Sequence, residues 1–446
     1  MTTTDLATVV MAAGRGTRMK SATPKHLHPL LGRRMLEWVL EAVRPLASGP
    51  LVVVCAPDTE DGLRASIDGA TFAVQQVPRG TGDAVASARE ALAGFDGDVL
   101  VVSGDAPLLT PELLEGLVEA HRRERPAVTI LTVEPEQPRA YGRILRDGDG
   151  RVTGVVEDAD ATPEQRAIRE LNSSIYVFAA ADLWEALGRL DADNAQGELY
   201  LTDTIGHLAA AGRRVATHAA EDPVVADGVN TRAELAAAAA VLRDRINARH
   251  MAAGVAIVDP ATTWIEPDAE LEPDAVIHPF TVVRGRSRVA AGAEVGPHAV
   301  LIDASVGAGA LAGPFCYLRP GTVLEADAKA GTFVEIKNSR IGERSKVPHL
   351  SYIGDAEVGS DTNVAAGAIT ANFPHQPGRP KGRTTIGSNV RTGIHNGFIA
   401  PVEIGDDSWI AAGTVVTDDV PPGSLAGFPP RQVTKEGYLR EERNDD

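Results

Sequence analysis

The sequence contains little cysteine, no long apolar run and far fewer basic than acidic residues. With only Cys55 and Cys316 in 446 residues, a disulfide framework is excluded, so we expect two buried core thiols and a reducing, cytoplasmic location. No apolar run reaches the length of a membrane span. The first apolar stretch, 6–13, has no lysine ahead of it, since Lys20 and Lys25 follow it, and this argues against a signal peptide. A net charge of −18 would repel nucleic acids and anionic membranes, so we expect neither as a partner.

What the sequence does contain is enough apolar material for two or three domains, since 43% of its residues are hydrophobic. Apolar runs at 7–11, 51–54 and 99–102 alternate with amphipathic stretches. Such alternation predicts an α/β domain whose largely parallel sheet is covered on both sides. We assign this amino-terminal domain to residues 1–229.

An alanine-rich segment follows, and it has apolar residues at helical spacing and no internal proline or glycine. Leu235, Leu242 and Ile246 form its apolar stripe. We therefore predict one linking helix over residues 230–253. Residues 254–446 form the second predicted domain.

In that second domain the periodicity changes to six. The first aliphatic residues at this spacing are Ile265, Leu271, Ile277, Val283, Val289, Val295 and Leu301. After slips the period resumes at Ile341, Val347, Ile353, Val358 and Val364, and again at Ile404, Ile410 and Val416. A six-residue repeat with small neighbours is typical of a hexapeptide solenoid, in which short parallel strands form a triangular prism. The alternative, a β-sandwich, would show period-two alternation instead.

A glycine-rich turn follows the first predicted strand, with Gly14 and Gly16 in the run 12–19 and a Pro-Lys pair ending at Lys25. Glycines there let backbone N–H groups approach a polyphosphate, and Arg18 and Lys25 would add positive charge. Taken alone, such a turn is equally well a tight connection. Asp105 ends a later buried strand, where ligand sites of such sheets lie, although an aspartate there is often only a turn residue.

Together these motifs resemble a known family, the bifunctional uridylyltransferases and acetyltransferases that make UDP-N-acetylglucosamine. The resemblance runs from Thr8 to about Tyr438 and its motifs occur in order. It implies a Rossmann-like nucleotidyltransferase domain followed by a left-handed parallel β-helix of hexapeptide repeats. It also implies UTP and acetyl-CoA as co-substrates, Mg²⁺ as the cofactor, and a homotrimer.

For the first domain, the resemblance implies that Arg18 and Lys25 are catalytic and that Asp105 and Asn230 hold Mg²⁺. Oxygen ligands of this kind suit that hard cation. The implied nucleotide-binding residues are Ala12, Ala13, Gly14, Gly16, Thr17, Gln75, Gly80, Thr81 and Asp105. The implied sugar-phosphate residues are Gly142, Glu157, Asn172 and Asn230. Ser103 and Ser174 depart from the family's pattern and leave the sugar preference less defined than the reaction type.

For the second domain, the resemblance implies that His349 is the general base, since a neutral histidine can take a proton from an attacking amine. A histidine in a repeat protein is otherwise a surface or corner residue. The implied sugar-phosphate residues are Arg319, Lys337, Tyr352, Asn363 and Asn372. The implied acetyl-CoA residues are Ala366, Arg383, Ile394 and Ala412.

An excursion over residues 372–383 breaks the six-residue period with a basic, proline-rich loop. Its cations Arg379, Lys381 and Arg383 could meet phosphate groups of coenzyme A or of the sugar, or the loop could be solvated without a ligand. Ile394 stands where the family carries a hydroxyl, and Pro429 where it carries an arginine. These two departures put the acetyl transfer in question.

Three functions follow from these patterns. The first is a bifunctional enzyme that acetylates glucosamine 1-phosphate and then transfers a uridylyl group to it. The second keeps the nucleotidyl transfer, for another sugar or nucleotide, and makes the solenoid mainly a trimerising module. The third, a nucleotide sensor on a scaffold, is disfavoured because the metal and phosphate residues are all present.

Overall fold

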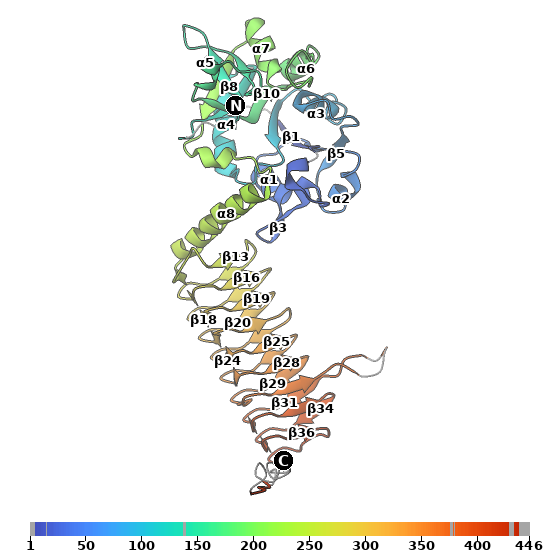
Figure 1. Ribbon diagram of the computed structural model, residues 1–446, viewed down its shortest axis with the longest axis vertical. Coiled ribbons are helices and arrows are strands. Elements are labelled where there is room, and N and C mark those ends of the chain that lie inside the picture. Colours follow the sequence, from blue (N-terminus) through green and yellow to red (C-terminus); the bar gives the residue numbers. More distant parts are fainter. Residues whose placement is uncertain are drawn as a thin grey trace, which may run out of the picture. The chain divides into compact units, whose positions relative to one another are not determined.

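The computed structural model describes residues 5–14, 16–136, 140–374, 378, 380–427 and 432–436. The chain divides into two compact units, 1–242 and 243–446. Their boundary falls inside a helix of 21 residues, α8 (Arg232–Ala252), which occupies the alanine-rich segment. Figure 1 shows an α/β unit before this helix and a stack of short strands after it.

The first unit is built on one mixed sheet of strand order β11-β7-β10-β6-β1-β4-β5, with the β8–β9 hairpin beside β10. β5, β4, β1 and β6 run parallel, as the apolar runs predicted. β10 differs, because it lies antiparallel between β6 and β7. The strands are β1 (Leu6–Ala12), β4 (Leu51–Cys55), β5 (Thr71–Val74), β6 (Asp98–Ser103), β7 (Val128–Val133), β8 (Arg143–Arg146), β9 (Val152–Val156), β10 (Leu171–Ala179) and β11 (Val215–Ala219), with β2 (Pro29–Leu30) and β3 (Arg33–Arg34) in a separate ladder.

Both faces of this sheet are covered, because successive side chains of its central strands point to opposite sides. Leu6 and Val10 of β1 pack with α1 and α4, whereas Ala7 and Val9 pack with α3, α6 and α7. The helices are α1 (Met35–Val43), α2 (Glu60–Arg64), α3 (Thr81–Ser87), α4 (Pro111–Glu124), α5 (Pro163–Arg166), α6 (Ala180–Leu187) and α7 (Asp203–Ala210), with 3₁₀ turns η1 (Thr17–Met19), η2 (Lys25–Leu27) and η3 (Pro223–Ala226).

The second unit is a parallel β-helix with three faces, as the six-residue period predicted. The first face holds β12 (Ala256–Ile257), β15 (Val276–Ile277), β18 (Glu294–Val295), β21 (Leu311–Ala312), β24 (Lys329–Thr332) and β27 (Lys346–His349), and continues as β32 (Arg391–Thr392), β35 (Trp409–Ile410) and β37 (Leu425–Ala426). The second holds β13 (Trp264–Ile265), β16 (Val282–Arg284), β19 (Val300–Ile302), β22 (Tyr317–Leu318), β25 (Glu335–Lys337), β28 (Tyr352–Gly354), β30 (Ile369–Ala371), β33 (Gly397–Ile399) and β36 (Val415–Val416). The third holds β14 (Glu270–Leu271), β17 (Arg288–Val289), β20 (Ser305–Val306), β23 (Val323–Leu324), β26 (Arg340–Ile341), β29 (Ala356–Val358), β31 (Thr384–Ile386) and β34 (Val402–Ile404).

The periodic aliphatic residues form the interior of this prism. All those named above are buried except Leu271 near the start, which is half-buried. The corners use left-handed backbone, and at one corner Phe280, His298, Phe315 and Phe333 all have positive φ. Their rings stack in successive coils at 4.7, 4.7 and 5.4 Å between centroids.

Candidate functional site

Three of the predicted side chains of the first unit meet at the carboxyl ends of two neighbouring strands. β1 and β6 are parallel neighbours, with Met11 opposite Ser103, so the loops that follow them lie side by side. Lys25 Nζ donates to a carboxylate oxygen of Asp105 and, at 2.7 Å, to Oδ1 of Asn230. Both oxygens predicted to hold a metal ion therefore lie within reach of one point.

The charges at this point balance each other. Burial opposes ionisation of Asp105, but the Lys25 ammonium and a hydrogen bond from Ser103 Oγ (2.6 Å) outweigh it and lower the pKa of that carboxyl. His26 lies buried beside them, and burial, reinforced by Lys25 and opposed by Asp105, lowers its pKa to about 4. The centre thus holds the Lys25 ammonium, the ionised carboxylate of Asp105, the amide oxygen of Asn230 and the neutral imidazole of His26.

The glycine-rich turn is shaped around Lys25. Gly16 has a φ of 60°, and a Cβ added there would lie 2.5 Å from Lys25 Cβ, so this position needs glycine. Ala12 and Ala13 are buried, whereas Gly14, Thr17 and Arg18 are exposed. Arg18 lies on η1, and no described residue pairs with it. The structure therefore brings Lys25, but not Arg18, to Asp105 and Asn230.

The residues predicted to read the base lie where β5 leads into α3. Gln75 is 4% exposed, and its carboxamide nitrogen donates to the Gly80 carbonyl at 3.1 Å and to the Asp83 carboxylate at 2.9 Å. Gly80 has a φ of 116°, and a Cβ there would lie 2.5 Å from the Leu199 carbonyl oxygen. Thr81 Oγ1 accepts from the Leu201 N–H at 3.0 Å. Hydrogen bonds within the chain therefore hold the segment from Gln75 to Thr81 in place.

The predicted sugar residues also converge. A Cβ on Gly142 would lie 3.5 Å from both Asn172 Cβ and Glu157 Oε2, so the three line one small space. Thr202 Oγ1 donates to Glu157 Oε1 at 2.9 Å, and Asn172 Nδ2 donates to the Tyr176 hydroxyl at 2.8 Å. Burial raises the pKa of Glu157, against the hydrogen bond from Thr202.

At the site around Lys25, only a few protein atoms could act as metal ligands. Among the described residues, no group of three or more His, Cys, Asp or Glu side chains is placed to hold a metal ion. Asp105 and Asn230 offer two hard oxygen donors, and Mg²⁺ commonly takes its remaining ligands from water and substrate phosphates. The donor set therefore fits a cation that arrives with a triphosphate.

In the second unit, Arg319 and Lys337 lie next to each other on one outer face. The pairing of β22 with β25 sets Leu318 opposite Ile336, which places the residues that follow them side by side. Lys381, from the loop over residues 372–383, lowers the pKa of Lys337, and Arg319 adds to this effect. Arg319 also donates to Glu335 at 2.7 Å. Three cations thus gather at one point, which suits a phosphate.

The proposed general base lies one corner away. His349 ends β27 and is exposed, and Tyr352 begins β28 just after the corner. Asn372 is buried and donates to Asp355, which also accepts from Asn338 at 2.5 Å. Asn363 lies on the first face, as His349 does, because it bridges Lys346 of β27 and Arg391.

The residues predicted for acetyl-CoA divide into two groups. Ala366, Ile394 and Ala412 lie in successive coils: the Ala366 carbonyl accepts from His395 at 2.8 Å, and the Ile394 carbonyl accepts from Gly413 at 2.8 Å. Ile394 is 52% exposed in this column. Arg383 lies apart, paired with Glu357 on the third face at 2.7 Å. Arg379 and Pro429 lie outside the described residues.

Several contacting residues were not predicted from the sequence. Ser103, whose hydroxyl supports Asp105, stands two residues before it, and this spacing places both on one side of a strand end. Thr202 and Asp83 support Glu157 and Gln75, but no sequence pattern links these partners. His26 and Asp355 were not singled out in the sequence, because their partners come from other segments of the chain.

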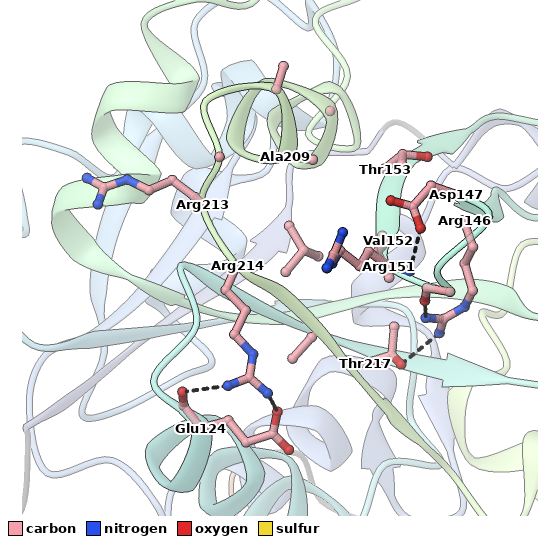
Figure 2. Close-up of a pocket in the computed structure, with 16 residues that line it drawn as sticks. Glu124, Arg146, Asp147, Arg151, Val152, Thr153, Ala209, Arg213, Arg214 and Thr217 are labelled. Carbon is pink, nitrogen blue, oxygen red and sulfur yellow. Dashed lines mark hydrogen bonds and ion pairs between the residues drawn. The ribbon is translucent and has the colours of Figure 1, made fainter.

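A separate cavity of about 830 Å³ lies between the β8–β9 hairpin, α7 and β11 (Figure 2). None of the predicted site residues lines it. Its four arginines already have carboxylate partners at 2.5–3.1 Å: Arg146 with Glu170, Arg151 with Asp149, Arg213 with Asp182 and Arg214 with Glu124. The cations of this cavity are thus already paired within the chain.

Comparison with known proteins places these features in a family. The model for MobA-like NTP transferase domains matches residues 8–208. The bifunctional protein GlmU of Mycolicibacterium vanbaalenii is 47% identical and is aligned over 98% of this chain and 94% of its own length. The GlmU proteins of Streptomyces avermitilis and Mycobacterium tuberculosis are 48% and 46% identical, each over 98% of this chain and over 94% and 93% of their own lengths.

Proposed function

This chain belongs to the family of bifunctional GlmU proteins, and we propose that it makes UDP-N-acetylglucosamine by two successive transfers. The first acetylates the amino group of glucosamine 1-phosphate with acetyl-CoA. The second joins the product to UTP and releases pyrophosphate. We assign uridylyl transfer to residues 1–229, a linking helix to 230–253 and acetyl transfer to 254–446.

The observation that carries the uridylyl transfer is the meeting of Lys25, Asp105 and Asn230. In this reaction a phosphate oxygen of the sugar phosphate attacks the α-phosphorus of UTP, and the bond to pyrophosphate breaks. No nucleophilic side chain is needed, so positioning and charge supply the catalysis. Asp105 and Asn230 would hold Mg²⁺, which when bound offsets the negative charge of the phosphates.

Lys25 has two roles in this account. In the structure, its ammonium neutralises Asp105 and donates a hydrogen bond to Asn230 Oδ1. With Mg²⁺ held by those two oxygens, the Lys25 ammonium would be available to the triphosphate, where it would stabilise the leaving pyrophosphate. Gly142, Glu157 and Asn172 would hold the sugar, and their close approach supports a compact ligand with hydroxyl and amide groups.

For acetyl transfer, the cluster of Arg319, Lys337 and Lys381 supports binding of the substrate phosphate. The amine then attacks the thioester carbonyl, a C–N bond forms, the C–S bond breaks, and the amine proton passes to His349. Tyr352 and Asn372 would orient the sugar, and Ala366, Ile394 and Ala412 would line the coenzyme. Asn363 lies on the same face as His349 and would act beside it. Arg383 lies on the third face and would need a neighbouring subunit's ligand to act.

We further propose that the enzyme is a homotrimer and works in the cytoplasm. Its β-helix presents flat outer faces, and sites between such prisms would explain why Arg383 lies apart from Tyr352. Among the described residues, no helix has the length and hydropathy needed to cross a membrane.

A second function is favoured by one observation. Ile394 exposes an apolar side chain in the column predicted to line the coenzyme, where a hydroxyl was expected. In this alternative the first unit is a nucleotidylyltransferase for another sugar or nucleotide, and the β-helix serves mainly in assembly.

Two assays on the full chain separate the functions. Acetyl-CoA with glucosamine 1-phosphate should release free thiol, and UTP with N-acetylglucosamine 1-phosphate and Mg²⁺ should release pyrophosphate. Pyrophosphate without thiol would support the second function. Neither product would refute both.

A further inference from the structure

Gln75 carries a carboxamide whose orientation is fixed by the protein alone. It follows β5, its backbone N–H donates to the Cys55 carbonyl at 2.9 Å, and the residue is 4% exposed. Its side-chain nitrogen donates to the Gly80 carbonyl and to the Asp83 carboxylate. A carbonyl and a carboxylate can only accept hydrogen bonds, so the atom facing them must be nitrogen.

The other end of the carboxamide is left for a ligand. Both hydrogens of Nε2 are used, and within the described part of the chain no group donates to Oε1. Oε1 is also not among the fully buried polar atoms that lack a partner, so it keeps some exposure. Gln75 can therefore offer a ligand an acceptor and no donor.

Asp83 is itself held in place. It is the third residue of α3, where a negative charge interacts favourably with the helix end. Arg79 Nη2 donates to its Oδ1 at 2.6 Å, which leaves Oδ2 for Gln75. The Gly80 carbonyl is equally fixed, because the neighbouring backbone is hydrogen-bonded to Leu199 on both sides, at 2.6 and 2.8 Å.

We propose that Asp83 is a positioning residue for base selection, because it locks Gln75 with its oxygen toward the base of the nucleotide. This rests on the proposed uridylyl transfer and adds a basis for its choice of base. Uracil carries an N–H at position 3, which can donate to Oε1. Cytosine carries a lone pair there, which would face the same oxygen and repel it.

The lock, by which we mean the hydrogen bond from Gln75 Nε2 to Asp83 that fixes the carboxamide, explains selection against cytosine but not against thymine. Thymine has the same N–H as uracil and differs by a methyl group on carbon 5. A UTP-to-CTP ratio therefore isolates the role of Asp83, whereas a UTP-to-dTTP ratio should be unaffected by it.

The test compares Asp83→Asn with the wild type. In the variant, Arg79 attracts the amide oxygen, so the amide nitrogen faces Gln75 and the lock is lost. We expect the UTP-to-CTP ratio of kcat/KM for pyrophosphate release to fall roughly tenfold, the scale of one charge-assisted hydrogen bond. Asp83→Ala removes both acceptor oxygens and should lower the ratio in the same way.

Asp182→Asn is a matched control. Asp182 is also the third residue of its helix, α6, and pairs with Arg213 at 3.1 Å, but it has no contact with Gln75. It should leave the ratio unchanged. A merely structural effect would lower activity with UTP and CTP alike, so only the ratio reports the lock.

Calorimetric titration of the same proteins with UTP and CTP separates this inference from the proposed reaction. The inference is supported if the wild type binds UTP more tightly than CTP and this preference falls in both Asp83 variants. That result stands even if no pyrophosphate is released. An unchanged ratio in folded Asp83→Asn and Asp83→Ala overturns it. So does wild-type protein that binds UTP and CTP equally, or binds neither.

Discussion

Replacing Lys25 by methionine should destabilise the metal-free protein and make its stability depend on Mg²⁺. Lys25 is 7% exposed and pairs with Asp105, whose side chain is 18% exposed. Methionine keeps the length of the side chain but removes the charge, so it leaves a largely buried carboxylate without its cation. Breaking such a pair by removing one partner costs about 3–5 kcal/mol.

Because Ser103 still donates to Asp105, we take the lower end, about 3 kcal/mol, of that range. For a folding unit of this size, 1 kcal/mol corresponds to roughly 2–4 °C in Tm, so the expected loss is roughly 6–12 °C. Saturating Mg²⁺ would replace the missing charge, so it should restore several degrees to Lys25→Met and fewer to the wild type.

Thermal unfolding followed by circular dichroism, in EDTA and in Mg²⁺, measures both effects. Lys20→Met, at an exposed lysine of the same unit, is the control and should melt within about 1 kcal/mol of the wild type. Equal Tm values for Lys25→Met and wild type in EDTA would show that the ion pair carries no stability, and the account of the centre would fail.

Three further outcomes are expected. Between pH 6.5 and 4 the unfolded chain binds a proton at His26 that the folded chain excludes. As the pH falls through this range, the unfolding free energy of the wild type should drop by up to about 3 kcal/mol more than that of His26→Val. Equal pH profiles of the unfolding free energy would contradict the lowered pKa of His26. Gly16→Ala should cost about 1–2 kcal/mol from its positive φ and also displace Lys25, lowering pyrophosphate release at least tenfold while thiol release is kept. Lys381→Met should raise KM for glucosamine 1-phosphate about tenfold with little change in kcat, and an unchanged KM would remove Lys381 from the phosphate site beside Lys337.

Much of the fold could be predicted because it follows from periodicity. The six-residue spacing from Ile265 to Leu301 forces aliphatic side chains into one interior, and all of them except Leu271 are buried. The antiparallel direction of β10 could not be predicted in the same way. A strand buried on both faces gives an apolar run whichever way it lies, so direction depends on the connections around it.

The candidate site shows the same division. Lys25 and Asp105 could be placed together because loops after adjacent parallel strands share one edge of a sheet, whereas Asn230 was expected with them only from the family resemblance. Arg18 was expected with them, yet the 3₁₀ turn leaves it exposed, since short turns have no periodicity from which a side chain's direction follows. The role of Asp83 depends on hydrogen-bond geometry, which a list of residue types does not contain.

The central claim is that Lys25, Asp105 and Asn230 form one metal-dependent centre for uridylyl transfer. Its most direct test is pyrophosphate release from UTP and N-acetylglucosamine 1-phosphate by the full chain, titrated with Mg²⁺, for wild type and Asp105→Asn. We predict release that requires Mg²⁺ in wild type and falls at least a hundredfold in Asp105→Asn, about 2.7 kcal/mol of transition-state stabilisation, with thiol release from acetyl-CoA retained. Equal release by both proteins, or release that continues in EDTA, would contradict the claim.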